Sequence, residues 1–149
     1  MMGSERSYAS LGEASVGDLS QAWEARLLDA ETLLAAGRFP SAVAMGVYAL
    51  EICLKARICA RLEVPLLPKA FEIHDLKGLL LLSGLSHRLE VNEARPTRRS
   101  WGEITRTAGL VADHRYRPNS VLGRSEAEAF FVQLNDPSSG VLPWILSQP

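Results

Sequence analysis

Apolar side chains recur at helical spacing along most of the chain, and turn residues separate the periodic stretches. In residues 19–36 the apolar positions lie three or four apart, with Asp18 placed to cap a helix and Gly37 placed to end it. The next stretch, residues 40–62, is apolar on nearly all sides and starts with Pro40, which fits the first turn of a helix. Such a stretch is typical of a central helix. We therefore predict two successive helices over these ranges.

The same periodicity predicts a third and a fourth helix. Asp75 is placed to cap a helix over residues 76–85. Ser100 and Glu103 form a capping-box pattern, which begins a helix that runs to about Tyr116. The side chains expected to face the core from this fourth helix are Trp101, Ile104, Ala108, Val111 and Ala112.

The rest of the chain predicts a loop, a fifth helix and an apolar tail. Residues 86–99 are polar and basic, contain a proline, and are predicted as a loop. Ser125 and Glu128 repeat the capping-box pattern and begin a fifth helix, which Asp136-Pro137 ends. Residues 141–146 are apolar and predicted as a short helix that packs Trp144 and Ile145 on the body. The inward positions expected on the fifth helix are Ala129, Phe130, Val132 and Leu134.

The pattern predicts an all-α fold. No stretch alternates with period two for long enough to make a strand, so we expect an up-and-down helical bundle of about five helices with a short apolar C-terminal helix. Residues 1–17 are rich in Ser, Gly and Ala and are predicted as a flexible leader in which Leu11 and Val16 are candidates to dock. Residues 18–149 are predicted to form one domain. With 47% hydrophobic and 22% charged residues, the composition is that of a globular protein.

Composition and charge exclude several classes of protein. The net charge of −1 argues against a protein that coats nucleic acid through bulk charge, although residues 87–117 carry an excess of arginines over acidic residues. The longest apolar run is too short to cross a membrane, and no secretory signal is visible. Cys53 and Cys59 are predicted as buried, reduced thiols of a cytoplasmic protein. No metal-ligand spacing occurs, so no metal and no cofactor is expected.

The order of several landmarks resembles that of HEPN domains. An apolar helix contains Tyr48-Ala-Leu-Glu-Ile-Cys-Leu-Lys-Ala, His74-Asp-Leu opens a helix, Arg115-Tyr ends one, and Trp144-Ile follows the last one. The resemblance covers residues 19–146. It implies a helical bundle that forms homodimers. Many members are metal-independent RNases of toxin–antitoxin or defence systems, and others lack the catalytic motif and serve as binding or partner modules.

The resemblance also implies candidate catalytic residues. RNase members use an arginine followed four to six residues later by a histidine, since arginine holds a phosphate while histidine moves a proton. Here the nearest pair is Arg106 and His114, with seven residues between them, so the chain departs from that pattern. The stretch His114-Arg115-Tyr116 does resemble the His-x-Tyr tail of some toxin members. Arg106, His114 and Tyr116 are therefore the candidate catalytic residues.

Two charges on the apolar central helix are candidates for ligand binding. Glu51 and Lys55 lie four residues apart, and if their face is covered both charges need partners. We expect Glu51 to bind an arginine of the fourth helix, such as Arg106 or Arg115; an ordinary surface pair is the alternative. Together with Arg115 and Arg117 they form the candidate ligand- or phosphate-binding set.

The unusual Arg–His spacing favours a HEPN-like binding or partner module that lacks the usual RNase motif. The resemblance places such a module in a toxin–antitoxin, defence or nucleotide-related system, with a partner such as a nucleotidyltransferase-type antitoxin, or with RNA or a nucleotide. The alternative is a divergent metal-independent RNase that uses Arg106 and His114, and a scaffold without a ligand is the third reading. The apolar second helix and Trp144 in the tail predict a homodimer. His74 is expected to be a capping or core-edge residue.

Overall fold

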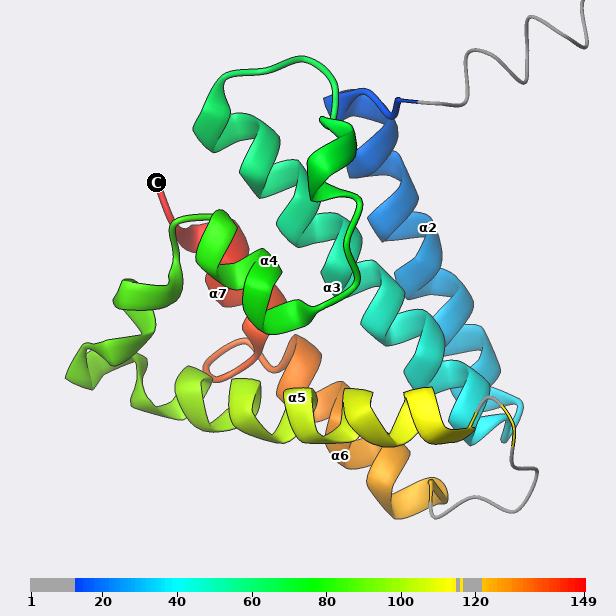
Figure 1. Ribbon diagram of the computed structural model, residues 1–149. Helices are drawn as coiled ribbons and strands as arrows, with labels where there is room; N and C mark the ends of the chain where they lie inside the picture. Colours follow the sequence, from blue (N-terminus) through cyan, green and yellow to red (C-terminus); the bar gives the residue numbers. More distant parts are fainter. Residues whose placement is uncertain (1–12, 115, 117–121) are drawn as a thin grey trace, which may run out of the picture.

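The structure is a computed structural model that describes residues 13–114, 116 and 122–149 (Figure 1). Within these residues the secondary structure is helical, apart from one isolated antiparallel bridge between Ser15 and Leu66. The predicted all-α helical bundle is confirmed. The helices are α2 (Val16–Ala35), α3 (Phe39–Leu62), α4 (Leu76–Leu82), α5 (Arg95–His114), α6 (Arg124–Asn135) and α7 (Val141–Ser147), with the 3-10 turns η1 (Lys69–Phe71), η2 (Ser86–Glu90) and η3 (Asn92–Ala94).

Helix α2 begins earlier than predicted, because Ser15 rather than Asp18 is its N-cap. The Ser15 hydroxyl accepts from the Asp18 amide at 3.0 Å, and the Asp18 carboxylate accepts from the Ser15 amide at 3.0 Å. This reciprocal pair is a capping box with Asp at its third position. The predicted leader therefore reaches into a helix at Val16, which also packs beside the loop after α3. Leu11 and the other residues before 13 lie outside the described residues.

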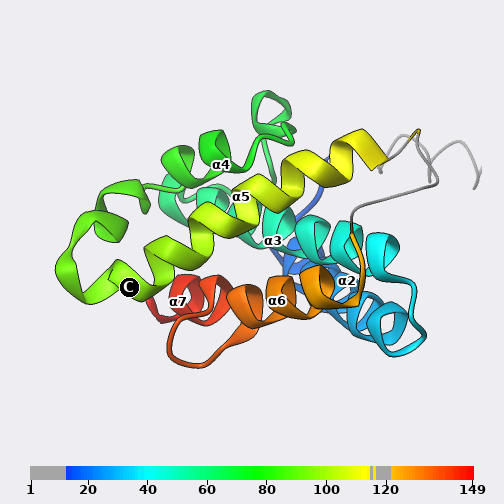
Figure 2. The same cartoon turned by 90° about the horizontal axis from the view of Figure 1, so that it is seen from below.

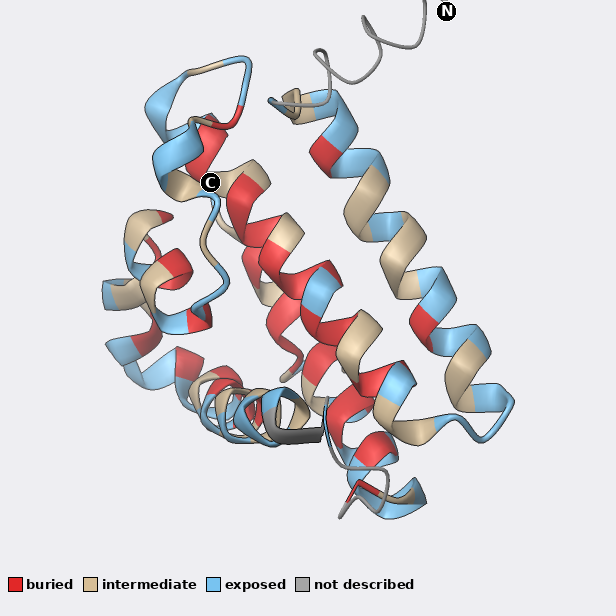
Figure 3. Cartoon of the chain, turned by 45° about the vertical axis from the view of Figure 1, so that its right-hand side comes forward, coloured by how far each residue is buried: buried red, intermediate tan, exposed pale blue. Residues whose placement is uncertain are grey.

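Helix α3 is the centre of the fold, as its sequence predicts. Gly37, with a φ of +76°, makes the turn from α2 into α3, and Pro40 lies in the first turn of α3. Half of the residues of α3 are buried, between Ala42 and Cys59, whereas in α2 only Leu19 and Ala30 are buried (Figure 3). Its apolar side chains pack against α2, α4, α5, α6 and α7 of the same chain. The apolar character of α3 is thus used within the fold.

The region between α4 and α5 differs from the prediction. Helix α4 keeps Asp75 as its N-cap but ends at Leu82, and Gly84 has a φ of +79° in the turn that follows. Helix α5 begins at Arg95 rather than at Ser100, so the predicted loop contains η2, η3 and the first turn of α5. The reason is that a proline is tolerated in a first turn, where its missing N–H has no helical partner to lose.

The C-terminal helices lie where predicted, but α6 turns a different face inward. The carboxylate of Glu126 accepts from the Gly123 amide at 3.0 Å and fixes the start of α6, so Ser125 is not its cap. Ala129 and Val132 are exposed, contrary to the prediction. The predicted tail helix is confirmed as α7, and Ile145 is buried in it. The buried side chains of α6 are Ala127, Phe130, Phe131 and Leu134.

The helices are not all aligned. Helix α5 runs obliquely across α3 in Figures 1 and 2, and seen from below α4 lies on one side of α5 while α6 and α7 lie on the other (Figure 2). Among the described residues, every helix is too short or too polar to cross a membrane. Cys53 and Cys59 are buried free thiols, as predicted.

Candidate functional site

A hollow of about 380 Å³ opens between α3, the start of α4 and the second half of α5. We call it the α3–α5 hollow. Its volume falls in the range of about 300–1,000 Å³ that is typical of small-molecule sites. Its lining residues are Val47, Tyr48, Glu51, His74, Asp75, Leu76, Lys77, Thr105, Ala108, Gly109, Val111 and Ala112.

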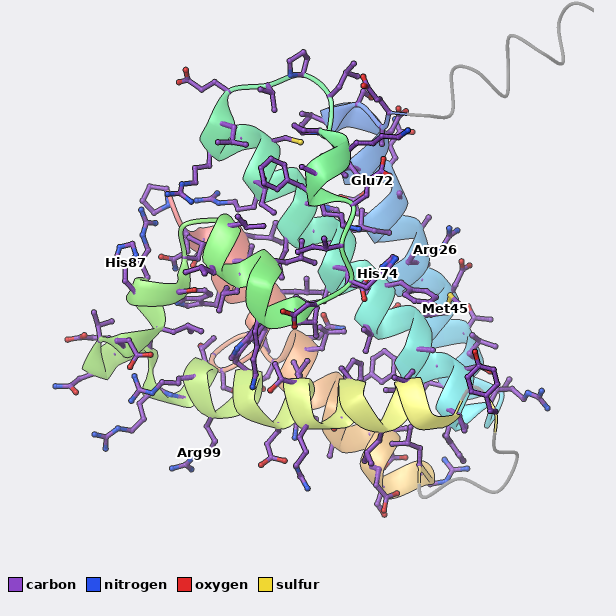
Figure 4. The ribbon with its side chains drawn as sticks, viewed as in Figure 1. Arg26, Met45, Glu72, His74, His87 and Arg99 are labelled. Atoms are coloured by element: carbon purple, nitrogen blue, oxygen red, sulfur yellow. The ribbon has the colours of Figure 1, made fainter. Side chains whose placement is uncertain are left out.

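A carboxylate lies at the base of this hollow. Glu51 projects from the buried helix α3, and only 9% of its side chain is exposed. The Nδ1 atom of His74 lies 3.1 Å from Glu51 Oε2. The His74 side chain is 81% exposed, and Figure 4 shows it on the segment before α4, against α3. The pair therefore joins a buried acid to an imidazole that reaches solvent.

The environment of Glu51 disfavours its charge. Burial raises the pKa of the Glu51 carboxyl above its usual value, and the hydrogen bond from His74 and the positive charges of His74 and Lys55 offset part of that rise. Among the described residues, His74 is the hydrogen-bond partner of Oε2, and none donates to the second oxygen. This second oxygen is not sealed in the interior, because Glu51 is absent from the buried unpartnered side-chain atoms of the described residues, and a donor in the hollow can reach it.

Small residues of α5 keep the hollow open. Ala108, Gly109 and Ala112 lie on the side of α5 that borders the hollow. A Cβ atom built on Gly109 would meet no other atom within 4 Å, so the space beside this residue is empty. The same test on Gly46 of α3 places the Cβ 2.5 Å from a ring carbon of Phe130, where α3 and α6 pack tightly. The chain thus packs closely on one side of α3 and leaves room on the other.

The rim of the hollow carries both signs of charge. Lys77 lies in the first turn of α4 and is exposed. Asp75 is engaged as the cap of α4, since it accepts from the Gly78 amide at 3.1 Å. Tyr48 is partly exposed at the wall, and the hydroxyl of Thr105 donates to its own helix at Gly102. An entering group therefore meets an aromatic ring, aliphatic walls and one buried acceptor.

Two of the residues that the sequence offered as catalytic, Arg106 and Tyr116, do not line this hollow. Arg106 is not among the lining residues; its guanidinium pairs with Glu103 on the exposed side of α5. The expected pairing of Glu51 with Arg106 is therefore wrong, since both residues have other partners. Tyr116 is 82% exposed. His114 is the last residue of α5, but its side chain, like Arg115 and Arg117, lies outside the described residues.

Lys55 and His74 also differ from their expected roles. Lys55 is buried, so the face of α3 that carries it is covered. It does not line the hollow, and it forms no hydrogen bond or ion pair with a described residue. Its charge acts on Glu51 from one helical turn away. His74 lies at the edge of the core, as expected, but the sequence analysis did not connect it with Glu51. The signal was a single acid on an apolar helix combined with a histidine beside the cap of the next helix.

The described part of the chain holds no cluster of three or more His, Cys, Asp or Glu side chains suited to a metal ion. Comparisons with protein-family models, with curated proteins and with solved structures found no match to this chain. The resemblance to HEPN domains therefore stays a prediction from the residues that carry it. What the α3–α5 hollow does must be argued from its own geometry.

Proposed function

We propose that this chain is a HEPN-like binding module that holds a nucleobase in the α3–α5 hollow. The observation that carries the proposal is the Glu51 carboxylate, which lies buried at the base of an open hollow with one oxygen unpartnered among the described residues. A donor that enters the hollow can bond this oxygen, and hydrogen bonds to an ionised group in a partly desolvated place are stronger than those between neutral groups. A group rich in N–H donors therefore fits this position.

A nucleobase fits the remaining walls. Guanine, cytosine and adenine each present amino hydrogens on an edge, and glutamate accepts from such amino groups in nucleic-acid recognition. Tyr48 and His74 offer partly exposed rings for stacking, and Val47, Leu76 and Val111 offer aliphatic surface. Lys77 at the rim is placed to meet a phosphate. Uracil has no amino group, so the proposed contact discriminates against it.

A divergent metal-independent RNase is the second candidate, and the His74–Glu51 pair is what favours it. A histidine held by a carboxylate is suited to general acid–base work. No arginine is among the described residues that line the hollow, and Arg106 is turned to Glu103. For this reason binding stands ahead of cleavage.

The biological setting rests on the resemblance alone. A homodimer, a nucleotidyltransferase-type partner and a role in toxin–antitoxin, defence or nucleotide-related systems are part of this proposal. The apolar character of α3 no longer supports the dimer, since those side chains are covered within the chain. Trp144 likewise packs against the core. Sedimentation of the purified protein at several concentrations tests the dimer.

The binding test uses calorimetric titration with GMP, AMP, CMP and UMP. We expect saturable binding of at least one amino-bearing nucleotide and at least about tenfold weaker binding of UMP, because a hydrogen bond to a charged group contributes about 1.5–3 kcal/mol and 1.4 kcal/mol is tenfold. Glu51→Gln should weaken the preferred nucleotide by a similar factor. Equal affinity for all four nucleotides, or an unaffected Glu51→Gln protein, contradicts the proposal.

A blocking variant has a matched control on the same helix. Gly109→Leu places a side chain in the hollow without meeting backbone, whereas Gly102→Leu adds the same side chain two turns away, outside the hollow. Both replacements raise helix propensity alike. Only Gly109→Leu should abolish nucleotide binding.

The RNase candidate is tested with end-labelled single-stranded RNA and tRNA in EDTA. The binding module predicts no cleavage by the folded protein. Cleavage that His74→Ala or His114→Ala abolishes, with the fold retained, would move the RNase ahead.

A further inference from the structure

The buried acid of the α3–α5 hollow offers acceptors and no donor. An ionised carboxylate has about four lone-pair positions for hydrogen bonds. In Glu51 the His74 ring takes one of them, with Nδ1 at 3.1 Å from Oε2, and no other described residue donates to this side chain. Most of the accepting capacity of Glu51 is therefore left for a group that enters the hollow.

Thr105 adds a second acceptor to the wall. Its hydroxyl has a single hydrogen, which it donates to the main-chain oxygen of Gly102 at 2.9 Å. Because that hydrogen is used within α5, the Thr105 oxygen can only accept from a ligand. Asp75 lines the hollow with a further carboxylate, one oxygen of which accepts from the Gly78 amide at 3.1 Å. The polar lining thus contains several groups that only accept.

The donors of the hollow are more exposed than its buried acid. Lys77 is exposed in the first turn of α4, and Tyr48 is 39% exposed on α3. The His74 side chain is 81% exposed and directs Nδ1 to Glu51, which is only 9% exposed. A ligand that reaches Glu51 therefore needs donors at its inner edge and can carry acceptors at its outer edge.

The nucleobases differ at the edge that carries the amino group. Guanine has its ring N1–H next to the amino group, so two donors lie side by side. Adenine has its amino group between two accepting ring nitrogens, and cytosine has an accepting ring nitrogen beside its amino group. A carboxylate can bond the amino group of all three bases. With adenine or cytosine, however, its second oxygen meets a lone pair, which repels it.

We propose that the α3–α5 hollow selects guanine among the nucleobases, with N1–H and the amino group both donating to Glu51. This inference rests on the proposed function, which allows any amino-bearing base. A small cation with the same donors fits less well, because the walls are aliphatic at Val47, Leu76 and Val111 and suit a flat ring. Glu51 is then the residue that determines which base is held.

A hollow without base selectivity makes a different prediction. In that case the contact between Glu51 and His74 only fixes the segment before α4 on α3. Nucleotides then bind through ring stacking and through their phosphate group. Stacking tolerates every base, because each base has a flat face. The affinities for GMP, AMP and CMP would then differ little, and Glu51→Gln would change all of them by one factor.

The test is calorimetric titration of the full chain with GMP and related nucleotides at about pH 8, above the usual pKa range of a carboxyl group. IMP keeps N1–H and lacks the amino group. The 2-aminopurine nucleotide keeps the amino group, but its N1 is an acceptor. We expect both of these, and also AMP and CMP, to bind at least about tenfold more weakly than GMP, which equals about 1.4 kcal/mol.

Two matched variants show whether the carboxylate is the selective group. The Glu51→Gln side chain offers a donor beside an acceptor, which matches the amino group and ring nitrogen of adenine. GMP should therefore lose at least about tenfold in affinity, whereas AMP and CMP should keep or gain affinity. Glu72→Gln removes the same charge from an exposed residue before α4 that does not line the hollow (Figure 4), and it should leave all affinities unchanged.

The outcomes separate this inference from the proposed function. Guanine selection is overturned if AMP, CMP or IMP binds as tightly as GMP, or if Glu51→Gln weakens GMP, AMP and CMP by the same factor. If Gly109→Leu still abolishes binding in those cases, the proposed function stands without the selectivity. If no nucleotide saturates the protein, or if Gly109→Leu binds as the parent does, the proposed function fails and guanine selection fails with it.

Discussion

Two glycine-to-alanine substitutions should change the free energy of unfolding in opposite directions. Together they test whether there is open space beside Gly109 of α5 and close packing beside Gly46 of α3. Gly109→Ala adds a methyl group to α5 where no atom lies within 4 Å. Alanine is favoured over glycine in a helix interior by about 0.5–1 kcal/mol. With nothing to obstruct the methyl group, we expect the free energy of unfolding to rise by that full amount.

Gly46→Ala makes the same backbone gain but adds its methyl group against the core. The new Cβ would lie 2.5 Å from Phe130 Cε1 and 3.5 Å from Leu134 Cδ2. The Phe130 ring is fully buried and meets Phe131 edge-on at 5.4 Å between centroids, so it has little room to retreat. Overpacking of this kind costs about 1–3 kcal/mol. After the helix gain of about 0.5–1 kcal/mol is subtracted, a net loss of up to about 2.5 kcal/mol remains.

Urea unfolding followed by tryptophan fluorescence measures both free energies, and thermal unfolding gives a second readout. A change of 1 kcal/mol shifts the Tm of a protein of this size by about 2–4 °C. Gly109→Ala should therefore raise the Tm, and Gly46→Ala should lower it by up to about 10 °C. A destabilised Gly109→Ala protein would mean that the α3–α5 hollow is filled. A stabilised Gly46→Ala protein would refute the close approach of α3 and α6.

Three further predictions follow from single groups. Burial raises the pKa of Glu51 in the folded protein above the value of about 4.5 in the unfolded chain. As pH rises from 4.5 through the folded value, the free energy of unfolding of the parent should therefore fall relative to that of Glu51→Gln. A difference between the two proteins that stays constant in urea unfolding from about pH 4 to 7 would contradict this. Burial raises the pKa of the Cys53 thiol to about 12, so a thiol reagent at pH 8 should label it only after unfolding, and rapid labelling of the native protein would refute its burial. Ser15→Ala removes the capping hydroxyl of α2 and should cost about 1 kcal/mol in chemical unfolding, against no change for an exposed serine outside the helices, such as Ser138.

Local signals in the sequence predicted the helices well where neighbouring residues determine them. The positive φ of Gly37, the cap at Asp75 and the stop at Asp136 depend on residues within one turn, and all three lie where the sequence placed them. The start of α5 was missed because Pro96 was interpreted as part of a loop, although a proline in a first turn costs no hydrogen bond. The inward face of α6 was missed for another reason. The buried side chains of α6 follow a three- and four-residue spacing that includes Phe131, whereas the prediction placed Val132 on the inward face.

The candidate site depends on contacts between distant segments, which periodicity cannot supply. Glu51 and His74 come from different elements, and their pairing follows from how the segment before α4 lies on α3. Ala108 was correctly placed facing the body, but the sequence did not show that α5 crosses α3 obliquely and leaves an opening there. The gathering of Arg57, Arg61 and Arg88 around one hollow was also missed, because these side chains come from α3 and η2 and meet only when the chain folds.

The most direct test of the proposed function is a titration of isotope-labelled protein with GMP, followed by NMR. The account predicts that amide signals of residues bordering the α3–α5 hollow shift with saturation, Glu51, His74 and Gly109 among them, while those of α7 stay unchanged. The Gly109→Leu protein should lose these shifts, and the Gly102→Leu protein should keep them. Shifts confined to other surfaces, or none for any amino-bearing nucleotide, would contradict the claim that this hollow holds a base.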